Sequence, residues 1–194
     1  MKNKCKESKL YIIVRPIIKA LFKFLYTPKI IGSENIPKSG RIILAGTHTN
    51  NFDCLLLMSS TKRCIHFLAK KELWSGLKGI IFSNMGLIPI DRKVKNPDSL
   101  KLAKEYLENG KVIGIFPEGT TEKEKGVLLP FKIGAVKMAF DTNTMIVPFV
   151  IKGKYKLFSK DLKIIFEKPI KVENANLDEE NSKLINIISS MMED

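Results

Sequence analysis

The sequence predicts a single α/β domain whose mixed, largely parallel sheet is flanked by helices, with an amphipathic helix at the N-terminus. Short apolar runs that are typical of buried strands alternate along the chain with longer segments of helical periodicity. Such alternation indicates a parallel sheet, because each crossover between parallel strands then contains a helix. The length of 194 residues fits one domain of ordinary size.

Six apolar runs are predicted to form strands, and most segments between them are predicted to form helices. The strands are expected over 41–46, 64–68, 87–90, 111–116, 145–151 and 162–166. The helices are expected around 54–58, over 70–84, 96–110 and 131–140, and from about residue 177. We expect antiparallel pairing only near the C-terminal edge of the sheet.

Residues 1–30 are expected to form an amphipathic helix at a membrane interface, ahead of an α/β domain over 31–194. The apolar stretch is too interrupted to span a bilayer, because Arg15, Lys19 and Lys23 recur in it at four-residue spacing. The helix could lie in a bilayer interface with these cations toward lipid phosphates. It could also pack on the domain as an ordinary amphipathic helix, and one helix can do both.

The formal net charge of +13 predicts attraction to an anionic partner. A nucleic acid is the weaker interpretation, because the basic residues are spread along the chain without interleaved aromatic residues or a zinc-finger string. An anionic membrane surface or a phosphorylated substrate fits better.

The three cysteines, Cys5, Cys54 and Cys64, lack the spacing of metal ligands and are odd in number. We therefore expect no metal site and no disulfide framework, and a reducing, cytoplasmic compartment.

Polar clusters follow three of the predicted strands, at the ends where parallel sheets gather ligands. After the first strand, His48 precedes Asp53 by five residues. This pair can form a general base with its orienting carboxylate if His48 lies in the loop and Asp53 in the first helical turn. After the strand over 87–90, Arg92 offers a fork of donors suited to phosphate. The other histidine, His66, lies within an apolar run and is predicted to be a core residue.

The third cluster is a polar loop after the strand over 111–116. Glu118 can accept a hydrogen bond from a substrate hydroxyl or anchor the loop, and Gly119 allows backbone to approach a ligand. Thr120 and Thr121 can donate hydrogen bonds, and Lys132 adds positive charge nearby. Each cluster alone is also ordinary turn or ion-pair sequence, but the three together predict one alcohol-activating, phosphate-binding site.

In this order the clusters resemble the motifs of the glycerolipid acyltransferase family, especially its bacterial lysophosphatidic acid acyltransferases. The first motif, a histidine and an aspartate separated by four residues, is matched by His48 and Asp53. The Ile-Pro-Ile-Asp-Arg string over 88–92, the Phe-Pro-Glu-Gly-Thr string over 116–120 and the Val-Pro pair at 147–148 match the other three motifs. The likeness covers about residues 30 to 155.

The resemblance implies an enzyme that transfers a fatty acyl group from an acyl thioester to the free sn-2 hydroxyl of lysophosphatidic acid. It implies His48 as the general base and Asp53 as its partner. Arg92 and the loop of Glu118, Gly119, Thr120 and Thr121, with Lys132, would hold the acceptor. Acyl-CoA or acyl carrier protein would deliver the acyl group, with no further cofactor. The implied location is peripheral, at the cytoplasmic face of the cell membrane.

Two positions depart from the family pattern. Thr47 stands where asparagine commonly precedes the motif histidine, and Thr121 stands where arginine commonly follows the Phe-Pro-Glu-Gly-Thr string. Since that arginine is associated with the acceptor phosphate, an acyltransferase that uses glycerol 3-phosphate or another lysolipid is an alternative. A noncatalytic basic protein that binds membranes or nucleic acid is an alternative from a different class. The sequence does not indicate the oligomeric state.

Overall fold

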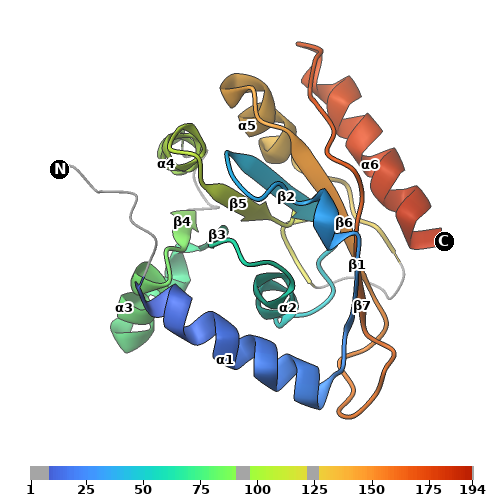
Figure 1. The fold of residues 1–194 in the computed structure, drawn as a ribbon. Coiled ribbons are helices and arrows are strands. Elements are labelled where there is room, and N and C mark those ends of the chain that lie inside the picture. The colour runs from blue at the N-terminus through green and yellow to red at the C-terminus, as the bar shows by residue number, and fades with distance from the viewer. Residues whose placement is uncertain (1–8, 91–96, 122–126, 194) are drawn as a thin grey trace.

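The structure of the protein is a computed structural model that describes residues 9–90, 97–121 and 127–193 (Figure 1). The strands are β1 (Lys29–Ile31), β2 (Ile42–Gly46), β3 (Ile65–Lys70), β4 (Ile88–Ile90), β5 (Val112–Ile115), β6 (Ile146–Lys152) and β7 (Lys163–Phe166). The α-helices are α1 (Lys9–Leu25), α2 (Asp53–Ser60), α3 (Gly76–Asn84), α4 (Pro97–Glu108), α5 (Gly134–Thr142) and α6 (Leu177–Glu193). Two short 3₁₀ helices are η1 (Ser33–Asn35) and η2 (Lys71–Trp74).

The strands form one seven-stranded sheet in the order β1-β7-β6-β2-β5-β3-β4. The pairs of neighbouring strands are parallel, except for β6 and β7, which pair antiparallel. The predicted fold class is therefore confirmed.

Helices cover both faces of the sheet, so its central strands are buried on both sides. Figure 1 shows α4, α5 and α6 on one side of the sheet, and α1 and α2 on the other. Successive side chains of a strand point to opposite faces. In β2, Ile42 and Leu44 join the apolar cluster to which α1 and α2 contribute, whereas Ile43 and Ala45 join the cluster of α4, α5 and α6. This double burial explains why the strands read as continuous apolar runs in the sequence.

The N-terminal helix ends before the predicted bound at residue 30, and an additional strand follows it. The helix ends at Leu25, because Pro28 cannot continue it and Thr27 adopts a positive φ of 44°. Strand β1 then pairs with β7, so β1 forms this edge of the sheet. The helix predicted over 70–84 is likewise divided into η2 and α3, where Gly76 has a φ of 61°.

Helix α1 packs on the domain and also exposes apolar side chains. Tyr11 and Phe22 are buried. Arg15, one of the three cations that could face lipid phosphates, donates a hydrogen bond to the carbonyl of Thr61 at 2.7 Å. The large apolar side chains that α1 exposes are Ile12, Ile13, Ile17, Leu21 and Phe24. Among the described residues, none of the helices is sufficiently long and apolar to traverse a bilayer.

Candidate active site

Several strand ends meet at one edge of the sheet. Strands β2, β3, β4, β5 and β6 run in the same direction, because each pairs in parallel with a neighbour in this group. Their carboxyl ends therefore lie at the same edge, where α/β proteins gather ligands. His48 follows β2, Glu118 follows β5, and the loop over 153–162 follows β6. Arg92, predicted after β4 as a phosphate ligand, lies outside the described residues.

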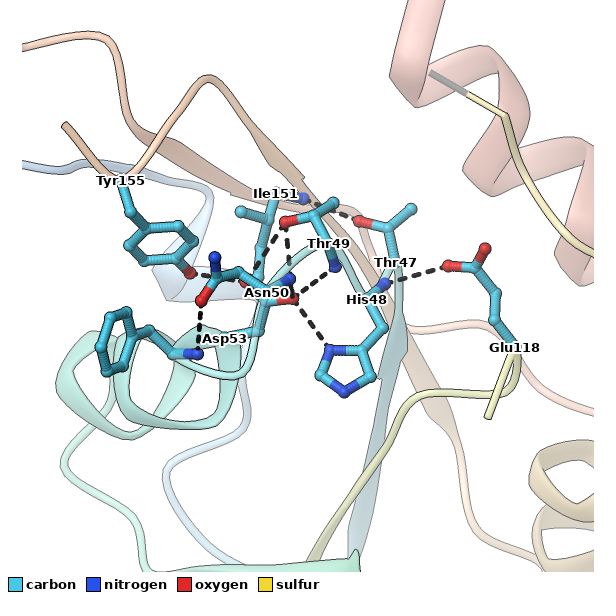
Figure 2. Close-up of polar contacts among 9 residues, drawn as sticks. Thr47, His48, Thr49, Asn50, Asp53, Glu118, Ile151 and Tyr155 are labelled. Carbon is cyan, nitrogen blue, oxygen red and sulfur yellow. Dashed lines mark hydrogen bonds and ion pairs between the residues drawn. The ribbon is translucent and has the colours of Figure 1, made fainter. Parts of the chain in front are cut away.

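His48 and Asp53 face each other across the loop between β2 and α2 (Figure 2). The Nδ1 atom of His48 lies 2.9 Å from Oδ2 of Asp53, which is the first residue of α2. The His48 side chain is 17% exposed and that of Asp53 is fully buried. When Nδ1 carries the proton that it donates to the carboxylate, Nε2 is the acceptor nitrogen of the neutral ring. The predicted arrangement, with His48 in the loop and Asp53 in the first helical turn, is therefore what the structure contains.

The Asp53 carboxylate is held by four groups besides the imidazole. The backbone N–H groups of Thr49 and Asn50 donate to Oδ2 at 2.5 and 2.8 Å. The Thr49 hydroxyl lies 3.3 Å from Oδ1, and the Tyr155 hydroxyl donates to Oδ1 at 2.6 Å. A buried carboxylate is tolerated only when such donors replace its lost hydration. These hydrogen bonds therefore hold the Asp53 carboxylate in one position.

Local sequence explains the shape of this loop. The side-chain oxygen of Asn50 accepts a hydrogen bond from the N–H of Phe52 at 3.0 Å, which is an Asx-turn. The backbone carbonyl of Asn50 accepts from the N–H of Asp53, also at 3.0 Å. These bonds turn the chain from β2 into α2 and direct the Asp53 side chain back toward His48. The residue directly before the helix is Phe52, whose side chain makes no capping bond.

Thr47 joins the end of β2 to β6. Its hydroxyl oxygen accepts a hydrogen bond from the backbone N–H of Ile151 at 3.0 Å. At Gly46, a Cβ atom would lie 2.1 Å from the carbonyl oxygen of Phe149, so only glycine allows β6 to approach this closely. The threonine that departs from the family pattern thus has a structural role directly before His48.

An aromatic ring fixes the plane of the imidazole. The rings of His48 and Phe116 are stacked, with centroids 4.1 Å apart and planes 16° from parallel. Phe116 itself lies between the core and the site, in contact with Phe67 and Phe149. The stacking restricts rotation of His48 to orientations compatible with the Asp53 contact.

Glu118 anchors two loops to each other. One carboxylate oxygen accepts the backbone N–H of His48 and the other accepts the backbone N–H of Leu129, both at 3.0 Å. The side chain is only 4% exposed. Of the two roles considered from the sequence, these contacts match loop anchoring, and the predicted contact with substrate stays a prediction.

The loop after β5 places a cation beside a glycine. Gly119 has a φ of 74°, and a Cβ there would come within 3.0 Å of the ammonium nitrogen of Lys132. The backbone N–H of Lys132 also donates to the carbonyl of Pro117 at 3.0 Å. Thr120 and Thr121 follow in the same loop and are partly buried. The roles of Gly119, Thr120, Thr121 and Lys132 toward an acceptor remain predictions.

Cys54, next to Asp53, is not suited to be a nucleophile. Desolvation in the interior and the neighbouring Asp53 charge raise the pKa of its thiol to about 12. The thiol therefore stays protonated near neutral pH, whereas the thiolate is the reactive form. Within the part of the chain that the structure describes, no three histidine, cysteine or acidic side chains are grouped so that they could hold a metal ion.

Sequence analysis missed Tyr155. Three strand ends were searched for polar clusters, but the end of the strand over 145–151 was not, although the same reasoning applies to it. The chain continues there with Lys152, Gly153 and Lys154 before Tyr155. A tyrosine four residues beyond a strand end indicates a candidate site residue only once β6 is known to run parallel to β2.

The fold and the site define an α/β enzyme with a histidine–carboxylate pair at the carboxyl edge of its sheet. Residues 27–152 match the family described as Acyltransferase. The chain belongs to this family, as the four motifs in the sequence predicted.

Two bacterial relatives carry the name 1-acyl-sn-glycerol-3-phosphate acyltransferase. The protein from Bacillus subtilis is 32% identical over 73% of this chain and 73% of its own length. The protein from Borreliella burgdorferi is 34% identical over 84% of this chain and 65% of its own length. The match to a relative from Mus musculus, named as the alpha form of that enzyme, covers 50% of that protein.

A solved structure has the same fold. The crystal structure of the 1-acyl-sn-glycerophosphate (LPA) acyltransferase PlsC from Thermotoga maritima matches with a TM-score of 0.77. The match covers 94% of this chain and 78% of that chain, at 23% sequence identity. At this identity the likeness establishes the fold alone.

Proposed function

We propose that this acyltransferase transfers a fatty acyl group from an acyl thioester to the free sn-2 hydroxyl of lysophosphatidic acid, which gives phosphatidic acid for phospholipid synthesis. The names of the relatives support the acceptor and the reaction. The observation that carries the mechanism is the contact of 2.9 Å between His48 Nδ1 and Asp53 Oδ2. It orients a neutral imidazole so that Nε2 can receive a proton.

The chemistry needs one proton transfer in each direction. Nε2 of His48 takes the proton of the acceptor hydroxyl while that oxygen attacks the thioester carbonyl. The buried Asp53 carboxylate stabilises the imidazolium that forms. The tetrahedral intermediate then collapses with cleavage of the carbon–sulfur bond, and the leaving thiolate receives the proton from His48. The alcohol attacks the donor directly, which agrees with the raised pKa of the Cys54 thiol.

The loop after β5 supports binding of an anionic acceptor. The Lys132 ammonium group lies against Gly119, 13 positions away along the chain, and so adds positive charge beside the loop. Thr120 and Thr121 offer hydroxyl donors in the same loop. Arg92 is proposed as a further phosphate ligand on the basis of the motif alone. Thr121 in place of the family's arginine favours one alternative, an acyltransferase that accepts glycerol 3-phosphate or another lysolipid.

An apolar surface supports peripheral attachment to an anionic membrane. The exposed apolar side of α1 continues on α3, which packs against it and exposes Ile80 and Ile81. At the other end of α1, Phe158 of the β6–β7 loop packs its ring against Phe24, with centroids 5.8 Å apart. Figure 1 shows α3, α1 and this loop along one side of the molecule. The exposed Lys19 and Lys23 flank this surface on α1 and suit lipid phosphates.

The activity is tested with purified protein, lysophosphatidic acid, and either acyl-CoA or acyl carrier protein as the donor carrier. We expect transfer with at least one carrier. The His48→Ala variant is the control, and we expect it to be inactive. Parallel assays with glycerol 3-phosphate and other lysolipids compare the acceptors. Transfer only to one of these would establish the alternative acceptor, and absence of transfer with every combination would refute the proposal.

Membrane attachment is tested by sedimentation with phosphatidylcholine vesicles that contain phosphatidylglycerol. Phe24→Glu should weaken binding about tenfold or more, because a buried phenylalanine is worth roughly 1.5–3 kcal/mol. The matched control is Phe140→Glu, an exposed phenylalanine on α5 at the opposite face of the sheet. Equal loss in both variants, or no loss in Phe24→Glu, would argue against attachment through α1.

A further inference from the structure

Tyr155 reaches the Asp53 carboxylate from a distant part of the chain. It lies in the loop after β6, 102 residues from Asp53 in sequence, and its hydroxyl donates to Oδ1 at 2.6 Å (Figure 2). The two carboxylate oxygens have different partners. Oδ2 faces His48 and the backbone amides of Thr49 and Asn50, whereas Oδ1 takes the Tyr155 hydroxyl as its short contact.

We propose that Tyr155 is a positioning residue of the acyl transfer, whose hydroxyl holds the Asp53 carboxylate so that Oδ2 stays directed at His48. This role rests on the proposed function of His48 as the base. A carboxylate can rotate about the bond to its Cβ, and a donor fixed on Oδ1 opposes that rotation. The short contact between Tyr155 and Oδ1 therefore controls the geometry of the pair from the side away from the imidazole.

The surroundings of Tyr155 keep its hydroxyl in place. Its ring lies edge-on to Phe22 and Tyr26, with centroids 6.4 and 5.7 Å apart, and also contacts Phe52 at 5.9 Å. These rings come from α1, the segment after it, and the loop before α2. Edge-to-face packing of this kind restrains a ring without needing its hydroxyl. A phenylalanine would fill the same space, so packing alone does not explain why the residue is a tyrosine.

The charges nearby make the hydroxyl a permanent donor. Burial and the adjacent Asp53 charge raise the pKa of Tyr155 far above its usual value. It therefore keeps its proton and donates at every pH used for enzyme assays. Other titratable groups lie near Tyr155 and Asp53. They are Cys54 of α2, Tyr26 after α1, and Glu118, which binds the backbone of His48. The Cys54 thiol has a raised pKa and is neutral in this range.

The Tyr155→Phe variant tests the role while retaining the ring. We expect kcat to fall about tenfold and KM for the acceptor to stay within about twofold, because a hydrogen bond to a charged group is lost but no acceptor contact is. The acid limb of the pH–activity profile should move downward by about half a pH unit. The reason is that a carboxylate no longer held toward His48 stabilises the imidazolium less strongly.

Tyr26→Phe is the matched control, because it removes a hydroxyl from the same aromatic group without removing a donor to Asp53. We expect its kcat and its pH–activity profile to equal those of the wild type. The double variant Asp53→Asn with Tyr155→Phe should be no slower than Asp53→Asn alone, since Tyr155 acts through that carboxylate. Thermal unfolding of each variant shows whether any loss of activity follows from loss of structure.

Three results would overturn the proposal. They are an unchanged kcat and pH–activity profile in Tyr155→Phe, a lowered melting temperature with an unmoved profile, and effects of Asp53→Asn and Tyr155→Phe that multiply in the double variant. Failure of the proposed function would look different, because the wild type would then show no transfer, or activity would persist in His48→Ala. An inactive His48→Ala beside an unaffected Tyr155→Phe would remove only the inference about Tyr155.

Discussion

His48 lies two residues beyond the end of β2, whereas His66 lies inside β3 of the same sheet, and their surroundings differ accordingly. The His48 side chain is 17% exposed and faces the Asp53 carboxylate. His66 is 1% exposed, its Nδ1 lies 2.8 Å from the carbonyl oxygen of Gly86, and its ring packs on Tyr106 at 4.4 Å. The predicted core position of His66 is confirmed.

The partner of each ring determines what that ring can do. A carboxylate stabilises the charged imidazolium that a general base becomes, whereas a neutral carbonyl mainly selects which nitrogen carries the proton. The end of a strand also allows substrate to approach, while a position within a covered strand does not. One residue type therefore occupies two different environments, and its place relative to the strand end separates them.

The largest expected effect comes from making the same substitution at both histidines. His48→Ala should lower kcat by about a hundredfold to ten-thousandfold, the usual cost of removing a general base. His66→Ala should leave kcat per folded molecule unchanged. Acyl transfer measured at a temperature at which both variants are folded makes the comparison. Activity that persists in His48→Ala, or disappears in folded His66→Ala, would reverse the assignment.

A second comparison concerns the two buried carboxylates, Asp53 and Glu118. Asp53→Asn should lower kcat by about a hundredfold or more, because the amide cannot stabilise the imidazolium. Glu118→Gln should lower kcat by less than about tenfold, because Glu118 binds the backbone N–H of His48 and not its ring. Steady-state kinetics of both variants decide the point. A larger loss in Glu118→Gln would indicate that this carboxylate contacts the substrate.

Glu118 and His66 should contribute more to stability than to kcat. In Glu118→Gln, one of the two oxygens becomes an NH₂ group that faces a backbone N–H, so one anchoring bond to His48 or Leu129 is lost. We expect the free energy of unfolding to fall by about 1–3 kcal/mol. His66→Ala should lower it by a similar amount or more, because the substitution creates a cavity and removes the imidazole that lies within hydrogen-bond distance of the Gly86 carbonyl. Chemical denaturation measures both, and unchanged stability in either variant would contradict its structural role.

The smallest expected effect is that of Cys54→Ala. The pKa of about 12 keeps the Cys54 thiol neutral below about pH 11, so it should react slowly with thiol reagents at pH 7 to 9. Transfer by the variant should remain within about twofold of the wild type. Rapid modification of Cys54 at pH 8, followed by mass spectrometry of the labelled peptide, would contradict the raised pKa. Loss of transfer in the variant would revive an acyl-enzyme mechanism.

The sequence by itself determined the fold class, most of the elements and the central pair of the site. Strands and helices could be predicted because the apolar spacing that defines them is local. The contact between His48 and Asp53 could be predicted for the same reason, since a turn followed by the first residue of a helix brings together two residues five positions apart. Pro28 also indicates the end of α1 locally, because proline cannot continue a helix.

Only the tertiary structure decided the contacts that join distant segments. Nothing local indicates that Tyr155 donates to Asp53, that Arg15 binds the carbonyl of Thr61, or that β1 pairs with β7. The anchoring role of Glu118 likewise became visible only in the fold, where its two oxygens bind the backbone amides of two separate loops. These contacts depend on how the folded sheet and its helices bring distant segments together, which no spacing along the chain encodes.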